Sequence, residues 1–178
     1  NAMIAPLTPY AIKGAIWYQG ESNRTSTDYF KKLQALSAGW SKVFNVKDIP
    51  LYQVQIAPFD YNYGKNPSDS TLCDNIWKAQ YKGANEIPGM GIVDVHDTKI
   101  DIKNIHPIYK RPVATRLAAQ ALKKQYGKEL VTTGPSISAA KLNGSTVIVS
   151  FKDVDKGLST TDGKAPSWFE LSADGKIF

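Results

Sequence analysis

A polar stretch at positions 19–23, Gln-Gly-Glu-Ser-Asn, directly follows a short apolar run at positions 15–18. A buried strand does not need such an ending, and in open α/β sheets ligands bind just beyond the carboxyl ends of strands. Gln19 could offer its amide to a developing oxyanion, with the backbone N–H of Gly20 close by. Glu21 could accept hydrogen bonds beneath a site. The alternative interpretation is a polar turn that leads into a helix.

A second candidate group lies much further along the chain, at His106-Pro107. Acyl transfer needs a nucleophile, a base, a group that orients the base, and donors for the oxyanion. His106 is the candidate base, because it follows an expected strand and loop and is expected at or near the N-cap of a helix. Asp97 and Asp101 lie in the same loop and could orient its imidazole. The alternative is a solvated loop histidine.

Two further side chains are weaker candidates. Ser22 lies in Gly-Glu-Ser-Asn, which is not the Gly-x-Ser-x-Gly elbow, so we do not expect it to be the nucleophile. His96 could in principle share a metal ion with His106. No third ligand accompanies the two histidines at a usual spacing, so we expect no metal site.

The elements that would position these groups alternate between strands and helices over the first two thirds of the chain. Apolar runs predict strands, and apolar residues at three- and four-residue steps predict helices. Strands are expected at 15–18, 51–56 and 91–95, and helices at 29–44, 72–84 and 106–126, the last stopped by Gly127. This alternation predicts a mainly parallel sheet with helices on both faces. The intervening stretch 59–70 is long enough to be suspected of function.

A different pattern begins after Gly127. Short β-like segments at 136–140, 146–151 and 168–171 are separated by turn pairs. Asn143-Gly144 between alternating residues is a strong hairpin signal. We therefore expect a separate β element in the tail. A further turn at 173–176 leads us to expect that its domain is not complete in this chain.

Composition excludes several classes of protein. A chain of 178 residues predicts one domain, or one domain plus a piece of another. The formal charge is +6, but the lysines are scattered, so we expect no nucleic-acid partner. No apolar run approaches the length of a membrane span, and no membrane partner is expected. Cys73 is the single cysteine, which excludes an intrachain disulfide and a cysteine-based zinc site. Residues 1–3 resemble a tag remnant and an initiator methionine.

Several motifs resemble one family, in the same order along the chain. They are Met-Ile-Ala-Pro-Leu at 3–7, Trp-Tyr-Gln-Gly-Glu-Ser at 17–22, Leu-Tyr-Gln-Val-Gln-Ile-Ala-Pro-Phe at 51–59, Ala-Gln at 79–80 and Ile-His-Pro at 105–107. Through them the chain is similar to the interior of bacterial sialate O-acetylesterases of the SGNH-hydrolase superfamily. The resemblance covers nearly the whole chain, and the tail resembles the module that follows the hydrolase domain in that family.

The resemblance implies a fold, an activity and site residues. The fold would be a three-layer α/β/α sandwich with a parallel sheet, incomplete here, with residues 4–130 as a partial hydrolase-like domain and 131–178 as a partial C-terminal β module. The activity would be that of a serine esterase that removes O-acetyl groups from sugars, chiefly sialic acids, without a cofactor. His106 would be the catalytic base, and Gln19 and Gly20 would belong to the oxyanion region.

Two departures from the family pattern matter. The family's nucleophilic serine lies upstream of the Met-Ile-Ala-Pro segment, so we expect this chain to lack the nucleophile and to be inactive alone. Many members of the superfamily carry an aspartate three residues before the histidine, where Lys103 stands here. Asp97 and Asp101 are then the candidate acids. The alternative function is a non-catalytic carbohydrate-binding or scaffold protein derived from a hydrolase fold.

The resemblance also implies partners. An acetylated sugar is the expected ligand, and the export of homologous enzymes leads us to expect a periplasmic or extracellular location. An apolar strand at 15–18 without a neighbour would leave an uncovered edge. We expect this edge to cause self-association, or to be covered by the N-terminal residues or the β tail of the same chain. We further expect Gln19 and His106 at the carboxyl edge of one sheet, facing a shared cleft.

Overall fold

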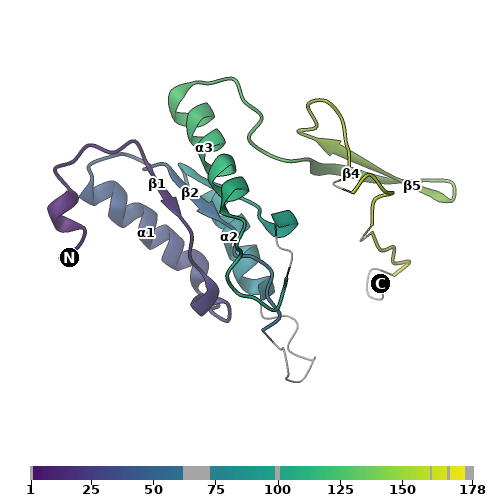
Figure 1. Ribbon diagram of the computed structural model, residues 1–178, viewed down its shortest axis with the longest axis horizontal. Coiled ribbons are helices and arrows are strands. Elements are labelled where there is room, and N and C mark those ends of the chain that lie inside the picture. The colour runs from purple at the N-terminus through teal and green to yellow at the C-terminus, as the bar shows by residue number, and fades with distance from the viewer. Residues whose placement is uncertain (1, 62–72, 99–100, 161, 168, 175–178) are drawn as a thin grey trace. The chain divides into compact units, whose positions relative to one another are not determined.

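A computed structural model gives the fold of the chain (Figure 1). The structure describes residues 2–61, 73–98, 101–160, 162–167 and 169–174. The chain forms two compact units, Asn1–Thr132 and Thr133–Phe178. Most of the stretch suspected of function, from position 62 to position 70, lies outside the described residues.

Three parallel strands form the sheet of the first unit. They are β1 (Ala15–Trp17), β2 (Leu51–Val54) and β3 (Met90–Val93), and they lie side by side in that order. All four residues of β2 are buried, as in strands that are covered on both faces. The strand expected at 91–95 is present, but it begins one residue earlier and ends at Val93.

Helices cover both faces of this sheet, as seen in Figure 1. The helices are α1 (Tyr29–Val43), α2 (Asp74–Glu86) and α3 (Lys110–Tyr126). Successive residues of a strand point to opposite faces, so β2 contributes to two separate cores. The core under α1 and α2 includes Tyr29, Leu33, Leu51, Ile76 and Met90. The core under α3 includes Tyr52, Val54, Val93, Val113 and Leu117. The expected three-layer α/β/α arrangement is therefore confirmed.

The start of α3 corrects one prediction. The helix begins at Lys110 with Tyr109 as its N-cap, so His106 does not cap it. The side chain of Asn104 accepts the backbone N–H of His106 at 2.9 Å. Such local side-chain bonds compete with helical hydrogen bonding and hold this segment in a turn before the helix. The predicted end is correct, because Gly127 terminates α3 with a φ of 62°.

β1 lies at one edge of the sheet. Among the described residues it pairs with β2 only. Ile16 lies opposite Tyr52, on the side of the sheet that α3 covers, and it is 66% exposed. α1, which follows this strand, has Asp28 at its N-cap, but the carboxylate pairs with Lys32 at 2.8 Å instead of capping the helix. Self-association through the outer edge of β1 stays a prediction.

The second unit contains the predicted hairpin. β4 (Ser136–Asn143) and β5 (Thr146–Lys152) pair antiparallel, and the two-residue loop is Gly144-Ser145, one residue later than the expected Asn143-Gly144 pair. Gly144 has a φ of 60°, as a tight two-residue turn requires. One face of the hairpin is apolar and carries Ala140, Leu142, Val147 and Val149. The expected strand at 168–171 is absent from its described part, residues 169–171.

Candidate functional site

The parallel strands bring polar segments to one edge of the sheet. Gln19 lies two residues after the end of β1, and Asp94 directly follows β3. The carboxyl edge of an open α/β sheet is the usual place for a ligand. Both segments contact α2, which spans the ends of the strands.

Gln80 of α2 is fully buried and connects the ends of β1 and β2. Its Oε1 accepts the backbone N–H of Ile56 at 3.1 Å. Its Nε2 donates to the carbonyls of Val54 at 3.2 Å and Gln19 at 3.4 Å. The sequence indicated this glutamine only through a family motif. The missed signal is its place between Ile76 and Gly83 on the buried stripe of the helix.

Two aromatic residues of α2 continue this connection toward β3. The indole Nε1 of Trp77 donates to the carbonyl of Ile56 at 2.9 Å. The hydroxyl of Tyr81 donates to the Oδ2 of Asp94 at 3.2 Å. One helix therefore fixes the carboxyl ends of all three strands.

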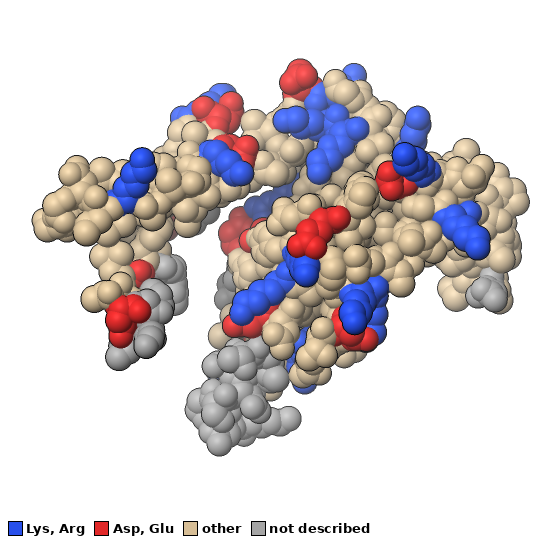
Figure 2. All heavy atoms as spheres, turned by 180° about the vertical axis from the view of Figure 1, so that it is seen from behind, with Lys and Arg blue, Asp and Glu red and all other residues tan. Residues whose placement is uncertain are grey.

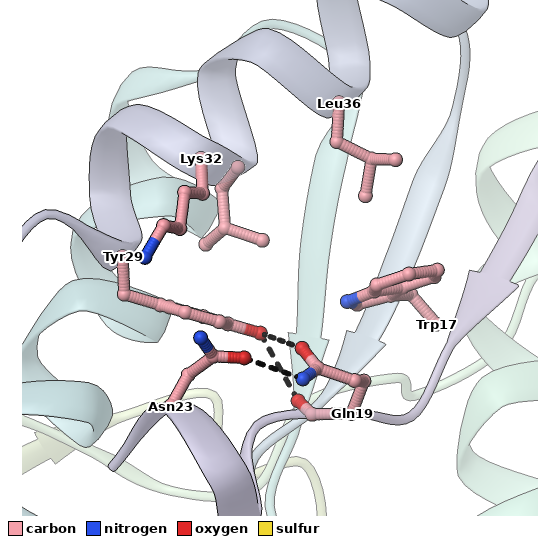
Figure 3. A pocket seen from close by; sticks show the side chains of 7 residues that line it. Trp17, Gln19, Asn23, Tyr29, Lys32 and Leu36 are labelled. Carbon is pink, nitrogen blue, oxygen red and sulfur yellow. Dashed lines mark hydrogen bonds between the residues drawn. The ribbon is translucent and has the colours of Figure 1, made fainter. Parts of the chain in front are cut away.

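Gln19 faces a pocket between β1 and α1 (Figure 3). Its Nε2 donates to the Oδ1 of Asn23 at 2.6 Å, and the hydroxyl of Tyr29 lies 3.0 Å from both its carbonyl and its Oε1. The pocket has a volume of about 160 Å³, and Trp17 and Leu36 line its apolar wall. The protein thus orients the amide, and one of its two N–H groups has no acceptor among the described residues.

Gly20 is required by close packing. It is buried with a φ of 156°, and a Cβ atom there would lie 2.7 Å from side-chain atoms of both Ile56 and Ile76. A short 3-10 helix, Glu21–Asn23, follows, in which Ser22 is exposed. Burial first, and then the charge of Glu21, raises the pKa of Tyr18.

His106 is exposed in the segment between β3 and α3, next to the buried Pro107. No hydrogen bond within the described residues joins its ring to Asp97 or Asp101. Both carboxylate oxygens of Asp97 accept from Arg116, at 2.7 and 2.5 Å, and these bonds lower the pKa of Asp97. Asp101 accepts the backbone N–H of Lys103 at 2.8 Å. The expected roles of the two aspartates, and the cleft shared by His106 and Gln19, stay predictions.

A different histidine has the oriented partner. Nδ1 of His96 lies 2.6 Å from Oδ1 of Asp94, and the same oxygen accepts the backbone N–H of His96 at 2.8 Å. Burial acts to raise the pKa of Asp94, but the hydrogen bonds from His96 outweigh it and lower this pKa to about 2. The sequence indicated His96 only as a possible metal ligand. The missed signal is an Asp-x-His triplet directly after a strand.

Neither the surface charge nor the arrangement of possible metal ligands indicates a further binding site among the described residues. On the face shown in Figure 2, basic and acidic side chains are interspersed. In the described part of the chain, no cluster of three or more His, Cys, Asp or Glu residues could hold a metal ion. No helix there is long and apolar enough to cross a membrane.

The fold and the edge residues together define a class. It is a three-layer α/β/α protein whose carboxyl sheet edge carries an oriented amide and a carboxylate–imidazole pair, the group types that hydrolytic acyl transfer uses. Residues 2–124 match the family of SASA carbohydrate esterases, described as sialic acid-specific acetylesterases. The chain belongs to this family, as its motifs indicated.

Individual relatives agree with this assignment. Mouse sialate O-acetylesterase is 29% identical over 97% of this chain and 34% of its own length. The human enzyme of the same name is 32% identical over 76% of this chain and 28% of its own. A crystal structure of a carbohydrate acetylesterase from Xanthomonas citri matches 84% of this chain and 34% of that one, with a TM-score of 0.70 and 31% identity. The chain thus spans about a third of the length of these proteins.

Proposed function

We propose that this chain is part of a carbohydrate O-acetylesterase, which removes acetyl groups from sugars and takes O-acetylated sialic acid as its substrate. The family match over residues 2–124 is the observation that carries the proposal. The likeness to a solved carbohydrate acetylesterase, at a TM-score of 0.70, supports it independently.

The proposed reaction is a two-step acyl transfer through an acetyl-serine. A serine hydroxyl attacks the acetyl carbonyl carbon while His106 takes its proton. The C–O bond to the sugar then breaks, and the sugar oxygen receives that proton. Water hydrolyses the acetyl-serine in the second step and releases acetate. The oxyanion would be stabilised by Nε2 of Gln19 and the backbone N–H of Gly20.

The geometry supports these roles to different degrees. Gln19 is held in place, and within the described part of the chain one of its amide hydrogens has no acceptor. His106 is exposed and accessible to a substrate. Asp101 is a better candidate than Asp97 for orienting His106, because Arg116 already binds both carboxylate oxygens of Asp97. Glu21 is proposed to accept hydrogen bonds beneath the site.

The first test measures acetate release from O-acetylated sialic acid, and hydrolysis of p-nitrophenyl acetate, by this chain and by its His106→Ala variant. Loss of a general base typically lowers the rate by about 10²–10⁴. A fall of this size would place both base and nucleophile in this chain, with Ser22 as the first suspect. Equal rates are expected, because we predict that the nucleophile is not in this chain. If the chain neither hydrolyses nor binds the acetylated sugar, the proposal fails.

The sequence encoded immediately upstream of this chain distinguishes the proposed esterase from the alternative, a carbohydrate-binding or scaffold protein. A serine motif at the end of a strand in that sequence supports the esterase, and an unrelated gene supports the alternative.

The proposal includes a periplasmic or extracellular location. It also includes self-association through the outer edge of β1, and sedimentation at low micromolar concentration tests this part.

A further inference from the structure

The turn after β3 holds an imidazole that the proposed reaction does not use. Asp94 accepts hydrogen bonds from three donors, which are the ring and the backbone N–H of His96 and the hydroxyl of Tyr81. An ionised carboxylate only accepts hydrogen bonds, so Nδ1 of His96 carries the hydrogen. In the neutral ring Nε2 is then an acceptor.

The position of His96 is fixed from several sides. Its ring meets the indole of Trp77 edge to face, with centroids 4.7 Å apart, and Trp77 is anchored on the carbonyl of Ile56. The guanidinium of Arg116 donates to the carbonyl of Asp94 at 2.6 Å and binds Asp97. The direction of Nε2 is therefore set before any ligand arrives, which lowers the entropic cost of binding.

Nε2 is open to a ligand. The side chain of His96 is 36% exposed, and no donor among the described residues bonds to Nε2. No serine, threonine or cysteine of the described chain forms a hydrogen bond with the ring, so the Asp94–His96 pair does not continue into a nucleophile as a catalytic triad does. An oriented acceptor beside a half-buried indole suits a ligand that offers hydroxyl groups next to apolar C–H surface. Sugars have this character.

We propose that Nε2 of His96 accepts a hydrogen bond from a hydroxyl of the sugar substrate, beside the indole of Trp77, and that this contact contributes to selection of the sugar. The inference rests on the proposed esterase function and adds a specificity-determining residue to its site. His96 thus differs in role from His106, because it contacts the sugar and not the acetyl group.

Binding is tested by NMR on the whole chain, which has only two histidines. ¹⁵N spectra of neutral His96 should show a hydrogen on Nδ1 and none on Nε2. Titration with N-acetylneuraminic acid should shift the His96 ring resonances saturably, and sodium acetate should leave them unmoved. A hydrogen on Nε2, or saturable sugar binding that leaves His96 unmoved, would overturn the proposal, and so would the absence of sugar binding.

The matched variants are His96→Phe, which keeps a ring against Trp77, and Lys78→Ala, at an exposed neighbouring position on α2. His96→Phe should weaken sugar binding about tenfold, the worth of one good hydrogen bond, and Lys78→Ala should not. Urea unfolding of both variants excludes a folding defect as the cause.

Where esterase activity is measurable, His96→Phe should raise KM for the acetylated sugar about tenfold, change kcat less than twofold, and leave p-nitrophenyl acetate hydrolysis unaltered. An equal loss on both substrates would show that His96 is the general base and would overturn the subsite. An unchanged KM would overturn the proposed sugar contact of His96 and would leave the proposed esterase function unaffected. Absence of all esterase activity is the result expected of a chain that lacks the nucleophile, and the binding result then decides the subsite by itself.

Discussion

The carboxyl ends of β1 and β3 lie on the same edge of one sheet, but they are stabilised by different chemistry. At β1, Gln19, Asn23 and Tyr29 are neutral and bond to one another. At β3, Asp94 and Arg116 belong to a network of charged groups. The first end is fixed by packing and by hydrogen bonds between neutral groups, and these contacts should not respond to pH. The second depends on a carboxylate and should lose stability in acid.

The largest expected effect is at the β1 end. Gly20→Ala places a methyl group 2.7 Å from Ile56 and Ile76, at a φ that side chains rarely adopt. Overpacking and backbone strain together should lower the free energy of unfolding by about 3 kcal/mol. Urea unfolding followed by tryptophan fluorescence measures this, because Trp17, Trp40 and Trp77 all belong to the first unit.

The matched control is Gly39→Ala. Gly39 lies in α1 with open space around the position of a Cβ atom. This substitution should stabilise the chain by about 0.5–1 kcal/mol, because alanine is the better helix former. If both variants changed stability in the same direction, tight packing around Gly20 would not be what fixes the β1 end.

A smaller loss is expected for Gln80→Met, which has a similar shape but cannot satisfy the backbone groups of Val54 and Ile56 that Gln80 now bonds. Unsatisfied buried groups should cost about 2 kcal/mol in total. The exposed Gln34→Met on α1 is the control and should be nearly neutral. The loss at Gln80 should be the same at pH 3 and pH 7; a pH-dependent loss would contradict the contrast between the two strand ends.

Asp94→Asn should cost about 1 kcal/mol near pH 7, a figure reduced for the 50% exposure of this side chain. The pKa of Asp94 is lowered to about 2 in the folded chain. Its stabilising effect is therefore present above the unfolded value near 3.9 and is lost as the pH falls through about 2. Urea midpoints of both proteins should converge over this range. A constant difference down to pH 2 would show that the carboxylate charge does not stabilise the β3 end.

The smallest effect is expected for Arg116→Lys. A lysine cannot bind both oxygens of Asp97 and the carbonyl of Asp94 together. The pair is partly exposed, so the loss should be roughly 0.5 kcal/mol and should shrink at high salt. Thermal unfolding at low and high ionic strength checks both points. If the loss of stability did not depend on salt, the guanidinium of Arg116 would stabilise the fold through packing and not through its charge.

Sequence patterns predicted the regular elements better than the contacts at their ends. β2 and the β4–β5 hairpin follow from apolar runs and from Asn143-Gly144, which are local signals. The predicted start of α3 was several residues too early. The turn at Asn104 outweighed the preference of proline for the first helical position. Pairing of β1 with β2, with α1 between them in the chain, required the tertiary fold.

The candidate site shows the same limit more strongly. Gln19 and Gly20 could be found because an odd polar ending follows an apolar run. Asp97 was proposed as a partner of His106, but in the structure it binds Arg116, which lies on the following helix. The bond between Asp94 and His96 spans only two residues, yet its significance depends on Trp77 and Tyr81 from α2. No spacing along the chain indicates that contact.

The aromatic contact between β1 and α1 gives this protein an optical signature. Trp17 and Trp40 meet edge to face with centroids 5.9 Å apart, and Trp40 in turn meets Phe44 at 6.4 Å. Indoles this close couple their electronic transitions, so the pair should add an exciton band to the far-ultraviolet circular dichroism spectrum. Trp17 also forms a wall of the pocket that holds Gln19. The band would therefore report in real time whether that wall keeps its shape when a ligand binds.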